Sequence, residues 1–123
     1  MFQITSVSAV GTGQSQTITI TGTGFGTQGA YTGLSPYIAL QDVTRGWQAG
    51  YAPANDQVTL AVSAWTNNQI VLQGFAGLWG VNNWELGAGD QLAVTVYNAG
   101  SNAGPSVCSN ITVGAGATTC TAP

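Results

Sequence analysis

Few side chains in this sequence have the chemistry of an acid, a base or a metal ligand. Its 123 residues include four carboxylates and one cation, which are Asp42, Asp56, Glu85, Asp90 and Arg45, and they include neither lysine nor histidine. Catalysis by a nucleophile and a histidine or lysine base is therefore excluded, as is a zinc site built on histidine and cysteine. We expect the protein not to be an enzyme and to use no cofactor.

The four carboxylates leave two further kinds of chemistry to consider. A glycosidase needs two carboxyl groups a few ångströms apart, one with a raised pKa, and the four here are scattered along the chain. Asp42, Asp56 and Asp90 are weak candidates for a calcium site, because backbone carbonyls and Asn oxygens would have to complete it. The sequence contains no closely spaced run of ligand residues such as the DxDxDG motif of calcium-binding loops. We therefore interpret these aspartates as solvated or turn-capping groups and predict no metal site.

Aromatic residues give the positive indication of a binding site. Two Gly- and Asn-rich stretches, 45–51 and 78–85, contain the candidates, which are Trp47, Tyr51, Trp79, Asn82, Asn83 and Trp84. The apolar face of a sugar ring stacks on an aromatic side chain, while neutral amide and hydroxyl groups bond its hydroxyls. The sequence therefore predicts a carbohydrate-binding surface on these loops. The alternative is that the loops fold back and bury the rings as a secondary core.

The composition supports a folded domain with an almost uncharged surface. Charged residues make up 4% of the chain, against about 25% in typical soluble domains. Hydrophobic residues make up 44% and include four tryptophans, which is unlike a disordered chain. With one arginine the surface cannot neutralise a run of phosphates, so we expect neither nucleic acid nor anionic membrane as a partner. No apolar run is long enough to span a membrane.

Alternation of apolar and polar residues dominates the chain. In 16–22, Ile18 and Ile20 point to one face while the intervening threonines point to the other, and no window shows a helical stripe. The segments predicted as strands are 4–8, 16–22, 37–42, 58–65, 69–72, 91–98 and 109–113. About seven short strands separated by turns favour an antiparallel β-sandwich.

The order of these strands and of the turn residues between them resembles that of IPT/TIG domains. The matching landmarks are Ile4-Thr5-Ser6-Val7, the run Ile18 to Gly26, the run Ala64 to Val71, the run Gly89 to Asn98 and Gly104-Pro105-Ser106. IPT/TIG domains are the immunoglobulin-like domains of plexins, transcription factors and many secreted bacterial proteins. The resemblance implies an all-β, immunoglobulin-like sandwich over residues 1–113, without catalytic activity. The chain departs from that pattern in lacking a proline after the first strand and in two enlarged loops, 27–57 and 75–86.

The two cysteines and the N-terminus bear on the compartment. Cys108 and Cys120 would close a short loop worth about 3 kcal/mol if they form a disulfide, and that bond would tether a tail over 114–123. The alternative is a pair of reduced thiols in a cytosolic protein. The stretch from Met1 lacks the features of a signal peptide, so we expect a module of a longer protein. Asn110-Ile111-Thr112 matches the glycosylation pattern weakly. We favour a secreted or cell-surface location.

Together these observations predict a non-catalytic accessory module that binds polysaccharide through its loop aromatics. The alternative is a structural or adhesive immunoglobulin-like spacer, or a subunit of a self-assembling filament, since low charge removes repulsion between copies. The expected partners are a polysaccharide or neighbouring domains of the same chain.

Overall fold

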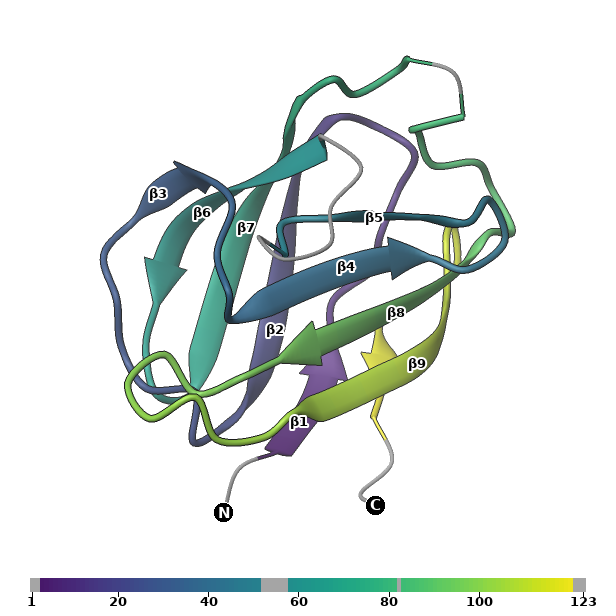
Figure 1. Cartoon of the computed structure of the whole chain (residues 1–123). Helices are drawn as coiled ribbons and strands as arrows, with labels where there is room; N and C mark the ends of the chain where they lie inside the picture. Colours follow the sequence, from purple (N-terminus) through teal and green to yellow (C-terminus); the bar gives the residue numbers. More distant parts are fainter. Residues whose placement is uncertain (1–2, 52–57, 82, 121–123) are drawn as a thin grey trace.

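The chain folds entirely as β-structure (Figure 1). The computed structural model describes residues 3–51, 58–81 and 83–120, and these contain ten strands and no helix. The all-β prediction is thus confirmed, and none of the described residues form a helix that could cross a membrane. The strands are β1 (Gln3–Val7), β2 (Ser15–Thr23), β3 (Tyr31–Gly33), β4 (Ile38–Asp42), β5 (Trp47–Ala49), β6 (Val58–Trp65), β7 (Gln69–Gly77), β8 (Gln91–Val96), β9 (Ser106–Thr112) and β10 (Thr118–Thr119).

All ten strands belong to one mixed sheet. Its order is β10-β1-β2-β7-β6-β5-β4-β8-β9, with β3 added on β6. The β5–β6 pair is parallel, at Ala49 and Val58, whereas the others are antiparallel. Figure 1 shows β4, β5, β8 and β9 in one layer, with β1, β2, β6 and β7 crossing behind them. The sheet bends round on itself and almost closes into a barrel.

A disulfide and a hydrogen bond join the two ends of this sheet. Cys108 of β9 is bonded to Cys120, which directly follows β10, with their Cα atoms 5.3 Å apart. The backbone N–H of Ile4 in β1 donates to Ser106 Oγ in β9 at 2.9 Å. The predicted disulfide is confirmed, and the tail that it tethers contributes β10, which pairs with β1. A disulfide is typical of an oxidising compartment.

The core forms because each long strand alternates. Ile18 and Ile20 of β2, and Leu92 and Val94 of β8, are buried between the layers, while the residues between them face outward. Burying each such side chain stabilises the fold by about 1.5–3 kcal/mol. The rings that close one end of the core are Phe25 and Trp65, and Trp65 Nε1 donates to the Phe25 carbonyl at 3.0 Å.

The seven predicted strands all have counterparts, and three more strands lie where loops and a tail were expected. β3 and β5 belong to the enlarged 27–57 loop, and β10 belongs to the 114–123 tail. These strands have two or three residues each, too few to show alternation in sequence. The immunoglobulin-like assignment remains a prediction, because the sheet has ten strands and a parallel pair.

Candidate functional site

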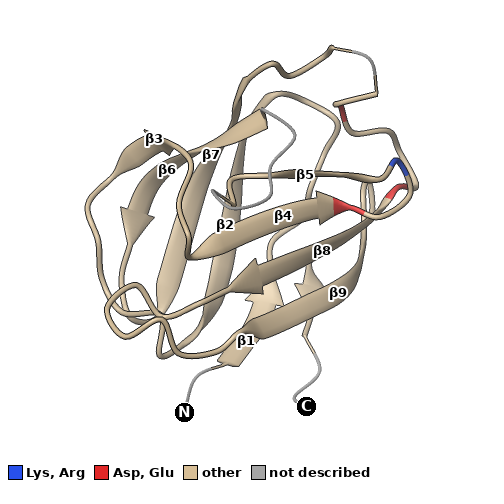
Figure 2. Cartoon of the chain, viewed as in Figure 1, with Lys and Arg blue, Asp and Glu red and all other residues tan. Residues whose placement is uncertain are grey.

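The charged residues that the structure describes gather at one end of the molecule. Figure 2 shows them where β4 ends and in the loops that lie beside it. Arg45 Nε donates to Asp90 Oδ2 at 2.6 Å, and a guanidinium NH lies 3.5 Å from Glu85 Oε1. Asn83 binds the same arginine twice, through its side-chain oxygen at 3.0 Å and through its NH2 to the Arg45 carbonyl at 3.1 Å. Arg45 and Asn83 therefore hold loops together.

Asp42 lies beneath this cluster and is wholly buried. Its Oδ1 accepts the Arg45 backbone N–H at 2.8 Å, while its Oδ2 meets no donor in the described part of the chain. Burial, and then the hydrogen bond that the protonated acid makes to Asp90, raise the pKa of Asp42 to about 6. Burial also acts to raise the pKa of Asp90, but hydrogen bonds from Asp42, Gly87 and Arg45 outweigh it and hold that pKa below its usual range.

Both carboxyl groups of this pair are withdrawn from the surface. Asp42 and Asp90 are 0% and 6% exposed, so a substrate at the surface does not reach the atoms that would act as acid and base. The described residues contain no group of three metal-ligating side chains, and Arg45 already neutralises Asp90. Asp56, the third calcium candidate, falls outside the described residues.

Two of the predicted loop tryptophans extend the core. Trp47 is 2% exposed and its Nε1 donates to the Glu85 carbonyl at 3.2 Å. The Trp79 ring stacks on Phe75 with centroids 4.6 Å apart and meets Trp47 edge-on at 6.0 Å. Trp84 is half-buried against the same core. Asn82, another of the loop candidates, lies outside the described residues. The geometry of this loop resembles a secondary core more than a platform.

The uncharged outer face of β4, β5 and β8 presents a different aromatic pair. Tyr51 follows β5 and Tyr97 follows β8, and their rings are nearly parallel, at 13°, with centroids 6.2 Å apart. Together with Ala39, Gln48 and Thr95 they line a shallow hollow of about 200 Å³. We call these five residues the tyrosine hollow.

Strand alternation explains why these five residues meet. Val94 and Val96 of β8 point inward, so Thr95 and Tyr97 point outward. Ala39 of β4 pairs with Thr95, which places two small side chains at the floor and leaves the hollow open. Burial, and then the adjoining Tyr97 hydroxyl, raise the pKa of Tyr51. The Tyr51 hydroxyl therefore stays neutral at physiological pH.

Of the predicted site residues, only Tyr51 belongs to the tyrosine hollow. Sequence reasoning did not select Ala39, Gln48, Thr95 or Tyr97. A signal was present for two of them, because the alternation of 91–98 places Thr95 and Tyr97 on the outward side of a strand. The local sequence gives no signal that β5 and β8 lie on either side of β4 in the sheet.

Comparison of the chain with protein-family models, with curated proteins and with solved structures finds no match.

Proposed function

We propose that this protein is a non-catalytic module of a secreted or cell-surface protein and that it binds neutral polysaccharide at the tyrosine hollow. The observation that carries the proposal is the near-parallel pair Tyr51 and Tyr97 beside an uncharged hollow that also contains the Gln48 amide. The Cys108–Cys120 disulfide supports an oxidising, extracellular setting.

The chemistry of the hollow suits a sugar ring. A pyranose has an apolar face made of C–H groups, which packs on an aromatic ring, and a rim of hydroxyls that need partners. Tyr51 and Tyr97 each offer a ring and a hydroxyl. The small side chain of Ala39 leaves room for the sugar on the outer face of β4. The ligand is held by stacking and by neutral hydrogen bonds.

The distribution of charge favours a neutral polymer over an anionic one. The one cation, Arg45, is bonded to Asp90, Glu85 and Asn83 beyond the end of β4. Tyr51 and Tyr97 instead adjoin Ser35 and Tyr37, which precede β4. None of the five residues of the tyrosine hollow is charged. We accordingly propose neither nucleic acid nor an acidic glycan as the partner.

The fold assignment belongs to the same proposal. The seven strands predicted from sequence lie in two layers that face each other across one core, as in an immunoglobulin-like domain. We therefore retain the IPT/TIG resemblance as a proposal, with β3, β5 and β10 as additions of this chain.

Retention on insoluble polymers tests the function. We expect the protein to be depleted from solution by at least one of cellulose, chitin and xylan. Replacing Tyr97 by alanine removes one stacking face and should weaken binding about tenfold, equivalent to about 1.4 kcal/mol. Leu78→Ala is the matched control, because Leu78 is 44% exposed on the tryptophan-containing loop.

The two variants separate the competing interpretations. If Leu78→Ala weakens retention and Tyr97→Ala does not, the binding surface lies on the loop rather than at the tyrosine hollow. If the unmodified protein is retained by none of the polymers, polysaccharide binding is contradicted and the structural or adhesive spacer becomes the better interpretation.

A further inference from the structure

The outer face that contains the tyrosine hollow continues across β8 to β9. Ala39 of β4 pairs with Thr95 of β8, and Thr95 pairs in turn with Val107 of β9. All three side chains lie on the outer face, because the residue that follows each of them is buried in the core. Neighbouring strands lie about 4.8 Å apart, so this row of residues extends the face by about 10 Å from β4 to β9.

Val107 gives this row an apolar end. Its side chain is 51% exposed, unlike that of Cys108 beside it, which is buried. Since Val107 pairs with Thr95, it lies diagonally opposite Tyr97, two positions further along the chain. Diagonal neighbours of this kind are about 7–8 Å apart, which is within reach of an aromatic side chain. The apolar surface of the tyrosine pair therefore continues to Val107.

Another hollow lies beyond Val107, between β9 and β10. It has a volume of about 240 Å³, and its lining includes Val107 and the polar residues Ser109, Asn110, Thr118 and Thr119. Ser109, Asn110 and Thr119 are exposed, so a ligand at the surface reaches their hydroxyl and amide groups. None of its lining residues is charged. We call it the β9 hollow.

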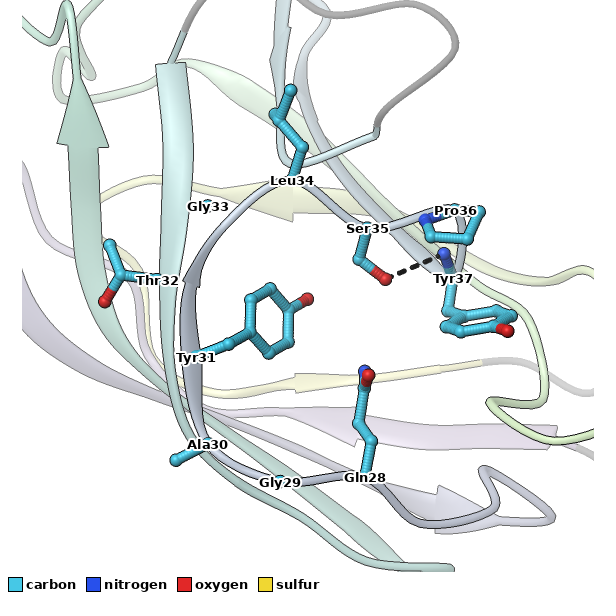
Figure 3. A pocket seen from close by; sticks show the side chains of 10 residues that line it. All are labelled: Gln28, Gly29, Ala30, Tyr31, Thr32, Gly33, Leu34, Ser35, Pro36 and Tyr37. Atoms are coloured by element: carbon cyan, nitrogen blue, oxygen red, sulfur yellow. Dashed lines mark hydrogen bonds between the residues drawn. The ribbon is translucent and has the colours of Figure 1, made fainter.

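The segment before β4 fixes the tyrosine pair on this face. Ser35 forms a β-bridge with Tyr51, and the Ser35 hydroxyl accepts the Tyr37 backbone N–H at 3.1 Å (Figure 3). The Tyr97 backbone N–H in turn donates to the Tyr37 carbonyl at 2.7 Å. These contacts hold the backbone of both tyrosines against the start of β4. A sugar that stacks on the tyrosine pair therefore lies beside Thr95, which lines the same hollow.

We infer that a neutral polysaccharide crosses the strands from the tyrosine hollow to Val107, where the valine side chain packs against the C–H face of a second sugar. This inference rests on the proposed function and extends it, because the site then takes more than one sugar unit. The β9 hollow receives the hydroxyls of that second sugar.

The order of groups along the row fits a polymer of sugar rings. Each ring has an apolar face and a rim of hydroxyls. The row presents the tyrosine rings, then the Thr95 hydroxyl, then the Val107 side chain, and then the hydroxyl and amide groups of the β9 hollow. An apolar ligand would displace water from these polar groups without replacing its hydrogen bonds. The absence of charge favours a neutral glycan over an acidic one.

Calorimetry on the intact chain tests the contact at Val107. The probes are the hexasaccharides of cellulose, chitin and xylan. Val107→Thr replaces one exposed methyl group by a hydroxyl at nearly constant volume, and it should weaken binding of the recognised hexasaccharide about threefold to fivefold. Val43→Thr is the matched control, because Val43 is 55% exposed in the turn after β4, and it should bind as the unmodified protein does. Neither change should alter the melting temperature, since both side chains are exposed.

Methyl NMR of the unmodified protein locates the same contact without a substitution. We expect the recognised hexasaccharide to shift the methyl signals of Val107 and to leave those of Val43 in place. If Tyr97→Ala weakens binding but Val107→Thr does not, and the Val107 signals stay in place, the inference is overturned and the proposed function stands. If none of the hexasaccharides binds, the proposed function fails and the inference fails with it.

Discussion

At the scale of the residue, Asp42 has the most altered chemistry of the described side chains. Its pKa is raised to about 6, by burial first and by its bond to Asp90 second. An unfolded aspartate has a pKa of about 3.9. Between these two values the folded protein keeps a proton that the unfolded chain releases. The stabilising contribution of Asp42 is thus complete below about pH 4 and is lost as the pH rises through about 6.

Asp90 acts in the opposite sense. Because its pKa is lowered in the folded state, its contribution is present above the unfolded value of about 3.9 and is lost as the pH falls below it. We expect the contribution of the pair to the free energy of unfolding to be greatest near pH 4, and to fall by on the order of 2 kcal/mol by pH 7. Urea unfolding across this range measures the slope.

The variant Asp42→Asn should remove that slope. An amide donates a hydrogen bond to Asp90 without needing a proton, so stability above pH 6 should exceed that of the unmodified protein by about 1 kcal/mol. Glu85→Gln is the control, because the Glu85 side chain is 51% exposed. If the free energy of unfolding of Asp42→Asn falls between pH 4 and pH 7 as it does in the unmodified protein, the folded protein does not keep a proton on Asp42.

At the scale of the element, the disulfide joins the two ends of the sheet order. Cys108 and Cys120 are 12 positions apart, so breaking the bond restores only a short loop to the unfolded chain. Replacing both cysteines by alanine should lower the free energy of unfolding by about 3 kcal/mol. Chemical denaturation with and without reductant checks this, and reductant should not affect the double variant. Equal midpoints for the two proteins would show that the hydrogen bond between Ile4 and Ser106 holds the ends without the disulfide.

The pairing of β7 with the start of β2 depends on a glycine. Gly74 has a φ of +114°, and a Cβ there would collide with the Gln14 carbonyl. Gly74→Ala should therefore lower the free energy of unfolding by about 2 kcal/mol or more. Gly116→Ala is the matched control, because a Cβ at Gly116 meets only open space. If both variants lose the same stability in a thermal melt, the close approach of β2 to β7 at Gly74 is contradicted.

The long strands carry a clear signal in the sequence, whereas the short strands and the contacts between distant residues do not. The long strands β2, β6 and β8 were predicted because period-two alternation over six or more residues has a strong signal. The sequence suggested that Trp47 lies in a loop because β5 has only three residues, although Trp47 pairs with Asp42 of β4 and its side chain is buried in the core. Tyr51 and Tyr97 are distant in sequence, and their meeting depends on β4 lying between β5 and β8. Tertiary pairing of this kind leaves no local trace.

At the scale of the whole molecule, charge and aromatic surface are separated. The described charges lie at one end of β4 and the tyrosine hollow lies toward the other. Retention on polysaccharide should therefore be the same at 0.1 M and at 1 M NaCl, although the Debye length falls from about 10 Å to about 3 Å. Depletion from solution at the two salt concentrations measures this. A marked loss of retention in high salt would indicate a charged ligand or a different surface.

The central claim is that the face of β4, β5 and β8 binds a neutral glycan at the tyrosine hollow. Its most direct test is an NMR titration of the 15N-labelled protein with the hexasaccharides of cellulose, chitin and xylan in turn. We predict that one of them shifts the amide signals of Ala39, Gln48 and Thr95, and that Tyr97→Ala needs about ten times as much of that glycan to give the same shifts. Shifts confined to the loop around Trp79 and Trp84, or none with any of the three glycans, would contradict the claim.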